Sequence, residues 1–249
     1  MANAHSELRI RLRLVLRRLI ATPLHPQWLV ARRGLQRLQW VGARASGAVL
    51  DIGCADRAVR HSLLQAESYL GVDYPVTVSS MYQTRPDVFT NARRLPFQDG
   101  IFQSVLLLDV LEHLREPQIS LLEAARVLRP GGSLIITVPF AYPMHDQPHD
   151  YQRLTVHGLT HALESTGLAI EEIEEVGTGP ETALSNFCIV MAQGAIDSIS
   201  RPNWKILLAV PLAVGLIPLA NGLGWVLSFL MPVKGLWPGA YYVRAIRRP

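Results

Sequence analysis

The stretch AVLDIGCADR, at residues 48–57, decides the fold. Its apolar first half has the length of a buried strand and stops at an acid and a glycine, Asp51 and Gly53, as strands of parallel sheets do. The turn of small residues that follows lets the backbone approach a ligand closely. Residues 57–66 are expected to form a helix whose first N–H groups face that ligand. The stretch therefore predicts a ligand-binding turn after the first strand of an α/β sheet.

Apolar runs that end at an acid return twice further along the chain. Residues 69–73 end at Asp73, and residues 102–108 are followed by Asp109. Three further runs, at residues 133–138, 168–176 and 240–246, also have strand character. The helices expected between these runs cover residues 118–128, 155–166 and 181–199. This alternation predicts a parallel sheet covered by helices on both faces, with its ligand at the carboxyl edge.

The basic charge of the chain is concentrated at its N-terminal end. Residues 1–44 hold nine arginines and one acid, so they carry +8, whereas the whole chain carries +4. Helices are expected at residues 6–20 and 28–41, and arginine interrupts every apolar stretch that could serve as a secretory signal. Two roles are open for this arm. It could bind an anionic surface, such as lipid headgroups, or it could cover the domain with its arginine stems. Two cysteines, Cys54 and Cys188, are too few for a disulfide framework and indicate a reducing cytosol.

The turn after the first strand argues against a dinucleotide. A dinucleotide fingerprint needs G-x-G-x-x-G, and this chain has a single glycine there, Gly53. Asp56 would also repel a pyrophosphate. The acid before the glycine, Asp51, suits a cationic ligand instead.

Five stretches, in order, resemble motifs of the class I S-adenosylmethionine (SAM)-dependent methyltransferases, in particular the type 11 branch. They are Leu50-Asp51-Ile52-Gly53-Cys54-Ala55, Leu70-Gly71-Val72-Asp73, Asn91-Ala92-Arg93-Arg94-Leu95-Pro96-Phe97, Asp109-Val110-Leu111-Glu112-His113-Leu114 and Leu128-Arg129-Pro130-Gly131-Gly132. The resemblance implies a Rossmann-like, mostly parallel seven-stranded sheet that ends in an antiparallel strand. Ala55 and Arg57 stand where the family's first motif usually has glycines, so we expect a tighter loop.

The resemblance also implies a cofactor, SAM, and the residues that bind it. Asp73 would accept hydrogen bonds from both ribose hydroxyls, and Asp109 would lie near the methionine end. His113 either faces the site or caps the turn that follows it. The residues implied for cofactor binding are Asp51, Gly53, Cys54, Ala55, Asp73, Asn91, Leu95, Asp109 and His113.

The segment after the fifth strand is rich in residues that can do proton chemistry. It resembles an H-D-x-x-x-Y-R-x-T pattern of type 11 enzymes, and its candidate catalytic residues are His145, His149, Asp150, Tyr151 and Arg153. Three interpretations remain open: His149 or His145 is the general base, the cluster braces a lid, or His145, Asp146 and His149 bind a metal. Pro143 and Pro148 make a regular helix through the two histidines unfavourable, so their spacing is weak support for a metal, and none is predicted.

Residues 206–232 contain no charged side chain and are long enough to cross a bilayer. Pro211, Pro218 and the turn signal Asn221-Gly222 interrupt the segment. The strand at residues 240–246 must return to the sheet, and basic residues flank both ends. We therefore expect a hairpin that enters the cytosolic leaflet, with a helical pair packed on the domain as the soluble alternative.

These observations together predict four segments. They are a basic helical arm (1–44), a SAM-binding methyltransferase core (45–203), an apolar membrane-associating hairpin (204–235), and the last strand with a basic tail (236–249). The predicted function is methylation of a hydroxyl on a lipid-linked, glycan or isoprenoid substrate, at the inner face of the cell membrane. A soluble enzyme acting on small metabolites, a non-catalytic interaction subunit and a nicotinamide-dependent enzyme are the alternatives. Nucleic acid is not favoured as a partner.

Overall fold

The computed structural model describes residues 18–77, 85–200, 204 and 206–248. Most of the helix predicted at residues 6–20 lies outside this range. The described residues form two compact units. The sheet unit comprises residues 36–77, 85–140, 144–176 and 240–248, and the helical unit comprises residues 18–35, 141–143, 177–200, 204 and 206–239.

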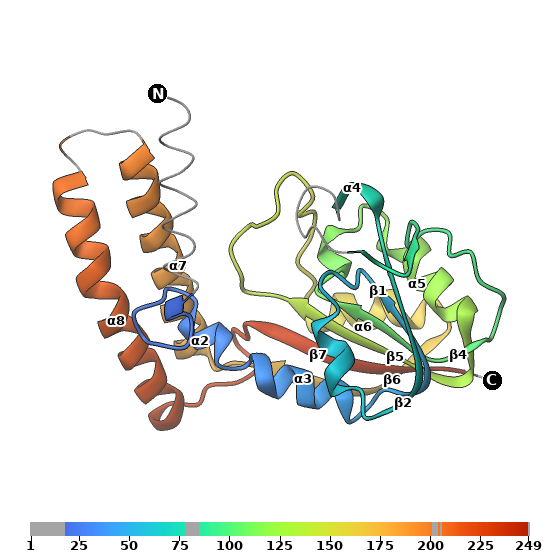
Figure 1. Cartoon of the computed structure of the whole chain (residues 1–249). Coiled ribbons are helices and arrows are strands. Elements are labelled where there is room, and N and C mark those ends of the chain that lie inside the picture. The colour runs from blue at the N-terminus through green and yellow to red at the C-terminus, as the bar shows by residue number, and fades with distance from the viewer. Residues whose placement is uncertain (1–17, 78–84, 201–203, 205, 249) are drawn as a thin grey trace. The chain divides into compact units, whose positions relative to one another are not determined.

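A seven-stranded sheet with the order β3-β2-β1-β4-β5-β7-β6 forms the sheet unit (Figure 1). Only β7 runs antiparallel to its neighbours, β5 and β6. The strands are β1 (Ser46–Ile52), β2 (Gln65–Asp73), β3 (Val88–Phe89), β4 (Phe102–Leu108), β5 (Leu128–Pro139), β6 (Leu168–Val176) and β7 (Ala240–Arg247). The predicted Rossmann-like fold, with a mostly parallel seven-stranded sheet and an antiparallel last strand, is confirmed.

Each face of the sheet has its own hydrophobic core. Leu50 and Ile52 of β1 pack on one face, together with side chains of α5 (Pro117–Val127) and α6 (Val156–Glu164). Val49, directly before Leu50 in the sequence, packs on the other face with Trp40 of α3 (Gly34–Gly42). Successive strand residues point to opposite faces, so this alternation is what a sheet covered on both sides requires.

The segment between β1 and β2 differs from the prediction. Instead of a helix over residues 57–66, it forms a five-residue 3₁₀ turn, Ala58–Ser62, and β2 begins at Gln65. Arg57, just before the turn, has a left-handed backbone with φ of 59°. The predicted helix N-terminus facing the ligand is therefore wrong. The expected helix at residues 28–41 is likewise divided, into α2 (Trp28–Ala31) and α3.

Two long helices make up most of the helical unit. They are α7 (Gly179–Ser200) and α8 (Ile206–Leu230), which lie side by side in opposite directions (Figure 1). The predicted hairpin within residues 206–232 is wrong, because α8 continues through Pro211 and Pro218. Asn221, read as a turn residue, is fully buried and donates from Nδ2 to the carbonyls of Pro23 (2.7 Å) and His25 (2.9 Å). The reversal in direction occurs between α7 and α8 instead.

Candidate active site

Asp51 at the end of β1 is 2% exposed, and its Oδ2 accepts a hydrogen bond of 2.6 Å from the Tyr69 hydroxyl. Burial raises the pKa of Asp51 to about 6, and the negative charge of Asp73 adds to the rise while Tyr69 opposes it. The carboxyl edge of the sheet therefore holds a carboxyl group whose ionisation in the fold carries a free-energy cost.

Asp73 at the end of β2 holds the turn after β1 in place. Its Oδ2 accepts the backbone N–H of Ala55 at 3.0 Å, and its Oδ1 accepts that of Tyr74 at 2.7 Å. Burial raises the pKa of Asp73, and these two backbone hydrogen bonds oppose the rise. A carboxylate has about four lone-pair sites, so both oxygens keep capacity for a further donor.

The turn after β1 keeps a glycine-like backbone where its side chains are not glycine. Gly53 has φ of 77°, and a Cβ added there would lie 2.5 Å from Cγ2 of Val110. Ala55 and Arg57 also have positive φ values, 43° and 59°. Residues with a Cβ adopt this conformation at a cost of roughly 1–2 kcal/mol each. Such strain clusters at functional sites.

Asp109, directly after β4, also has a positive φ, 55°. Its Oδ1 accepts a hydrogen bond of 2.8 Å from the Thr137 hydroxyl of β5, and its Oδ2 forms an ion pair with Arg37 of α3. The structure therefore brings Asp51, Asp73 and Asp109 to the same edge of the sheet, as the sequence predicted.

Cys54, Asn91 and Leu95, which the resemblance assigned to cofactor binding, are occupied by structural contacts. Burial raises the pKa of the Cys54 thiol to about 12, so it is no nucleophile. The Oδ1 of Asn91 accepts the backbone N–H of Arg93 at 3.0 Å. Leu95 is 3% exposed within the core, and its N–H donates to Glu123. Their predicted contacts to a cofactor remain predictions.

Residues 144–154 lie against the turn after β4. The backbone N–H of Tyr151 donates to the carbonyl of Glu112 at 2.9 Å, and Nε2 of Gln152 donates to the carbonyl of Leu111 at 2.8 Å. Within the segment, the buried Asp150 carboxylate accepts hydrogen bonds from the Arg153 guanidinium and from the backbone N–H of His145. Asp150 and Arg153 therefore brace this segment and position His145.

His149 and Tyr151 form the exposed part of the same segment. Nδ1 of His149 lies 3.1 Å from the Tyr151 hydroxyl, which accepts a hydrogen bond of 2.8 Å from Arg115. The His149 ring is exposed, whereas His145 is half-buried. Of the two histidines that the sequence left open, His149 is thus the one more accessible to a molecule arriving from solvent.

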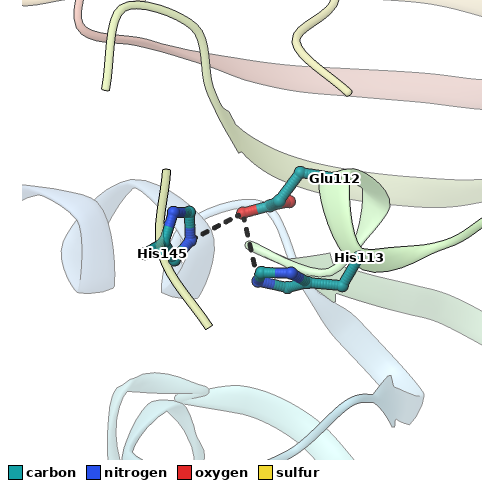
Figure 2. Close-up of side chains that lie close together, drawn as sticks. All are labelled: Glu112, His113 and His145. Carbon is teal, nitrogen blue, oxygen red and sulfur yellow. Dashed lines mark ion pairs between the residues drawn. The ribbon is translucent and has the colours of Figure 1, made fainter. Parts of the chain in front are cut away.

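Three side chains that the sequence did not group converge beside these residues (Figure 2). Oε1 of Glu112 lies 3.8 Å from Nε2 of His113 and 3.8 Å from Nε2 of His145. Burial raises the pKa of Glu112 to about 8, and the charge of Asp109 adds to the rise. Glu112 and His113 stood within a quoted motif, but His145 comes from another loop, so no local pattern predicts the cluster.

Three arginines of the N-terminal arm form ion pairs with acidic residues of the protein itself. In the helical unit, Arg33 pairs with Glu181. In the sheet unit, Arg37 pairs with Asp109, and Arg44 binds both oxygens of Glu172 while stacking 4.1 Å from the Trp40 ring. These three residues support the covering role of the arm.

Comparison with known proteins agrees with this fold. Residues 50–136 match a family model described as a methyltransferase domain. Residues 50–136 are therefore similar to a methyltransferase domain, and proteins of this class use SAM as the cofactor.

Two curated relatives have names that state an activity. A ubiquinone biosynthesis O-methyltransferase of Pseudomonas paraeruginosa is 26% identical over 125 residues, which are 46% of this chain and 50% of that protein. A protein of Mycolicibacterium smegmatis named as an S-adenosylmethionine-dependent methyltransferase is 30% identical over 135 residues, 50% of this chain and 52% of its own length. The aligned part thus spans about half the length of these relatives.

Solved structures share the fold at low identity. The 4+2 cyclase SpnF has a TM-score of 0.52 and 20% identity, and the match covers 87% of this chain and 82% of that one. A protein of Bacillus halodurans described as a methyltransferase has a TM-score of 0.51 and 15% identity, and the match covers 87% and 99%. Because one neighbour is named a cyclase, the fold alone does not determine the reaction, and the functional argument must come from the site.

Proposed function

We propose that the protein transfers a methyl group from SAM to a hydroxyl oxygen. The observation that carries this proposal is the convergence of Asp51, Asp73 and Asp109 at the carboxyl edge, beside a turn in left-handed conformation. Three carboxyl groups disfavour a ligand with phosphates and suit one with an ammonium and a sulfonium. This arrangement argues against the nicotinamide alternative.

The donor set at this edge fits SAM. Asp73 would accept the ribose hydroxyls with the lone pairs that its two backbone hydrogen bonds leave open. The backbone at Gly53, Cys54 and Ala55 would bind the methionine part, with Asp51 and Asp109 supplying negative charge. Asn91 would lie beside the adenine. When bound, SAM supplies the electrophilic methyl group.

The chain's own residues must hold the acceptor and accept its proton. His149 is proposed as the general base, because its exposed ring has one nitrogen against the Tyr151 hydroxyl. If Nδ1–H donates to Tyr151, the lone pair of Nε2 is available for the acceptor's proton. Asp150 and Arg153 would position the segment without taking part in proton transfer.

Cofactor binding is the first test. Asp73→Ala should weaken SAM binding, measured calorimetrically, by about 1.5–3 kcal/mol, because it removes hydrogen bonds to a charged acceptor. Asp99→Asn, at a carboxyl that is 74% exposed, is the matched control and should bind as the parent does. A folded Asp73→Ala protein with parental affinity, or a parent that binds NAD(H) in preference to SAM, would refute the proposal.

The acceptor is proposed to be lipid-linked or isoprenoid, because α8 exposes an apolar surface. Leu212, Leu219 and Phe229 are 52–69% exposed. In the described part of the chain, one helix is long and apolar enough to cross a membrane, and it spans Leu207–Leu230. Only 22% of its apolar 18-residue stretch is buried. Large exposed apolar surfaces mark interaction sites. The name of the Pseudomonas relative, a ubiquinone biosynthesis O-methyltransferase, also supports a hydroxyl on a lipid-soluble acceptor.

The location proposed is the cytosolic face of the cell membrane, with the α7–α8 pair as the anchor. Because α7 and α8 run in opposite directions, the chain returns to the side from which it left, so β7 can rejoin the sheet however deeply the pair is inserted. Basic residues of the N-terminal arm would add attraction to anionic headgroups, on the order of 1 kcal/mol each.

Vesicle sedimentation tests the anchor. Leu219→Asp should weaken binding to anionic vesicles at low and at high salt, because salt does not screen an apolar contact. Leu64→Asp, at a 90% exposed leucine outside the helical unit, is the control and should bind as the parent does. A folded, monomeric parent that stays in the supernatant at low salt would refute membrane contact and favour the soluble enzyme.

A further inference from the structure

Glu112, His113 and His145 present one ligand atom each to a common point (Figure 2). These three atoms all lie within 4.8 Å of one another. Glu112 and His113 come from the turn after β4, and His145 comes from the segment after β5. Neighbouring parallel strands deliver both segments to the same edge of the sheet, so the cluster is a product of the fold.

Glu112 is the unusual member of the cluster. Its side chain is 0% exposed, and among residues 18–77, 85–200, 204 and 206–248 neither carboxyl oxygen has a hydrogen-bond partner. A buried carboxyl group without a partner is costly, and native proteins seldom keep one without a reason. A cation at the common point of the cluster would supply the missing partner.

The two histidines are oriented by groups on their far sides. The carbonyl of His149 can only accept, so Nδ1–H of His113 donates to it at 2.9 Å. Nδ1 of His145 lies 3.4 Å from Oδ2 of Asp150 and 3.4 Å from Nη2 of Arg153, which are themselves hydrogen-bonded to each other. Both rings thus turn Nε2 toward Glu112. Metal-binding histidines commonly donate from the other ring nitrogen to a carbonyl or a carboxylate, as His113 does here.

We propose that Glu112, His113 and His145 bind a divalent transition-metal ion. With metal–ligand distances of about 2.1 Å, tetrahedral ligand atoms lie about 3.4 Å apart. The observed Glu112–histidine distances of 3.8 Å would have to shorten by less than half an ångström. Two imidazoles and a carboxylate suit Zn²⁺, Fe²⁺, Co²⁺ or Mn²⁺ better than Mg²⁺ or Ca²⁺, which prefer oxygen.

Three protein ligands leave at least one coordination position open, as in catalytic metal sites. An oxygen of the acceptor would occupy this position, where the ion favours its ionised form. This part of the inference rests on the proposed function, whereas binding of the ion does not. Metal binding and SAM binding are measured separately, so either can fail while the other holds.

The test uses the full chain, freed of metal with a chelator and titrated with Co²⁺ while its visible absorption is recorded. The parent should bind one Co²⁺ per chain and develop the bands of a four- or five-coordinate ion. Glu112→Gln, which keeps the shape and removes the charge, and His145→Asn should each weaken binding by 100-fold or more. His149→Asn, in the same segment but outside the ligand set, is the matched control and should bind as the parent does.

Two results would overturn the proposal. One is a parent that shows only the spectrum of hydrated Co²⁺, and the other is equal binding by the parent and the folded ligand variants. Circular dichroism checks the fold of each variant. If Glu112→Gln does not fold, His145→Asn decides the test, because the His145 ring is partly exposed and its replacement perturbs packing less.

Discussion

Replacing Asp51 by Asn should stabilise the protein at neutral pH. The pKa of Asp51 is about 6 in the fold against an ordinary value of 3.8. Below pH 4 the group is protonated in both states, and between pH 4 and 6 only the unfolded state releases its proton. Stability is therefore lost as pH rises through this window. A rise of two pKa units lowers the free energy of unfolding by about 3 kcal/mol at pH 7 and above. Asn cannot ionise, yet its amide oxygen can still accept the Tyr69 hydroxyl.

Urea unfolding of the parent and of Asp51→Asn at pH 4.5 and pH 8 measures this effect. The variant should have the higher free energy of unfolding. Its advantage over the parent should be small at pH 4.5 and approach about 3 kcal/mol at pH 8. Tyr69→Phe is the converse test, because loss of its hydrogen bond should raise the pKa of Asp51 and steepen the parent's pH dependence. An equal difference at both pH values would refute the argument.

Two further predictions concern the turn after β1 and the proposed base. Gly53→Ala should reduce the free energy of unfolding by about 2 kcal/mol or more in denaturant titrations, because a left-handed residue gains a Cβ that lies 2.5 Å from Val110. Gly131→Ala, at the same φ of 77° but with no atom within 4 Å, should show the smaller backbone cost alone. His149→Ala should lower kcat by about 10²–10⁴-fold while calorimetry shows unchanged SAM affinity, and a loss confined to thermal stability would favour bracing.

Strand positions could be read from the sequence because buried parallel strands are short and apolar throughout. Residues 102–108 and 168–176 were expected as strands, and β4 and β6 occupy these residues. The helix expected over residues 57–66 does not form, because the backbone at Arg57 is left-handed. An arginine in the sequence does not indicate this conformation, whereas a glycine would. Local pattern therefore identifies the strands better than the turns between them.

The structure of residues 206–232 and the cluster of Glu112, His113 and His145 could not be predicted from local sequence, because both depend on tertiary contacts. Pro211, Pro218 and Asn221 favour a turn locally, but Asn221 finds its partners in the carbonyls of Pro23 and His25, almost 200 positions earlier in the chain. Strand ends placed Asp51, Asp73 and Asp109 correctly, because they follow recognisable strands. His145 lies in an irregular loop, so nothing in the sequence shows that its ring meets Glu112.

The position of β7 has a consequence for synthesis and folding. This strand is the last described element to leave the ribosome, yet it lies in the interior of the sheet, between β5 and β6. Until residues 240–247 emerge, β5 keeps one unpaired edge and β6 has no partner strand, which is a hazard for aggregation. Residues 177–239 are translated before that strand. If they enter the membrane during translation, the nascent chain is tethered there before its catalytic sheet can close, so lipid attachment precedes the appearance of a working enzyme.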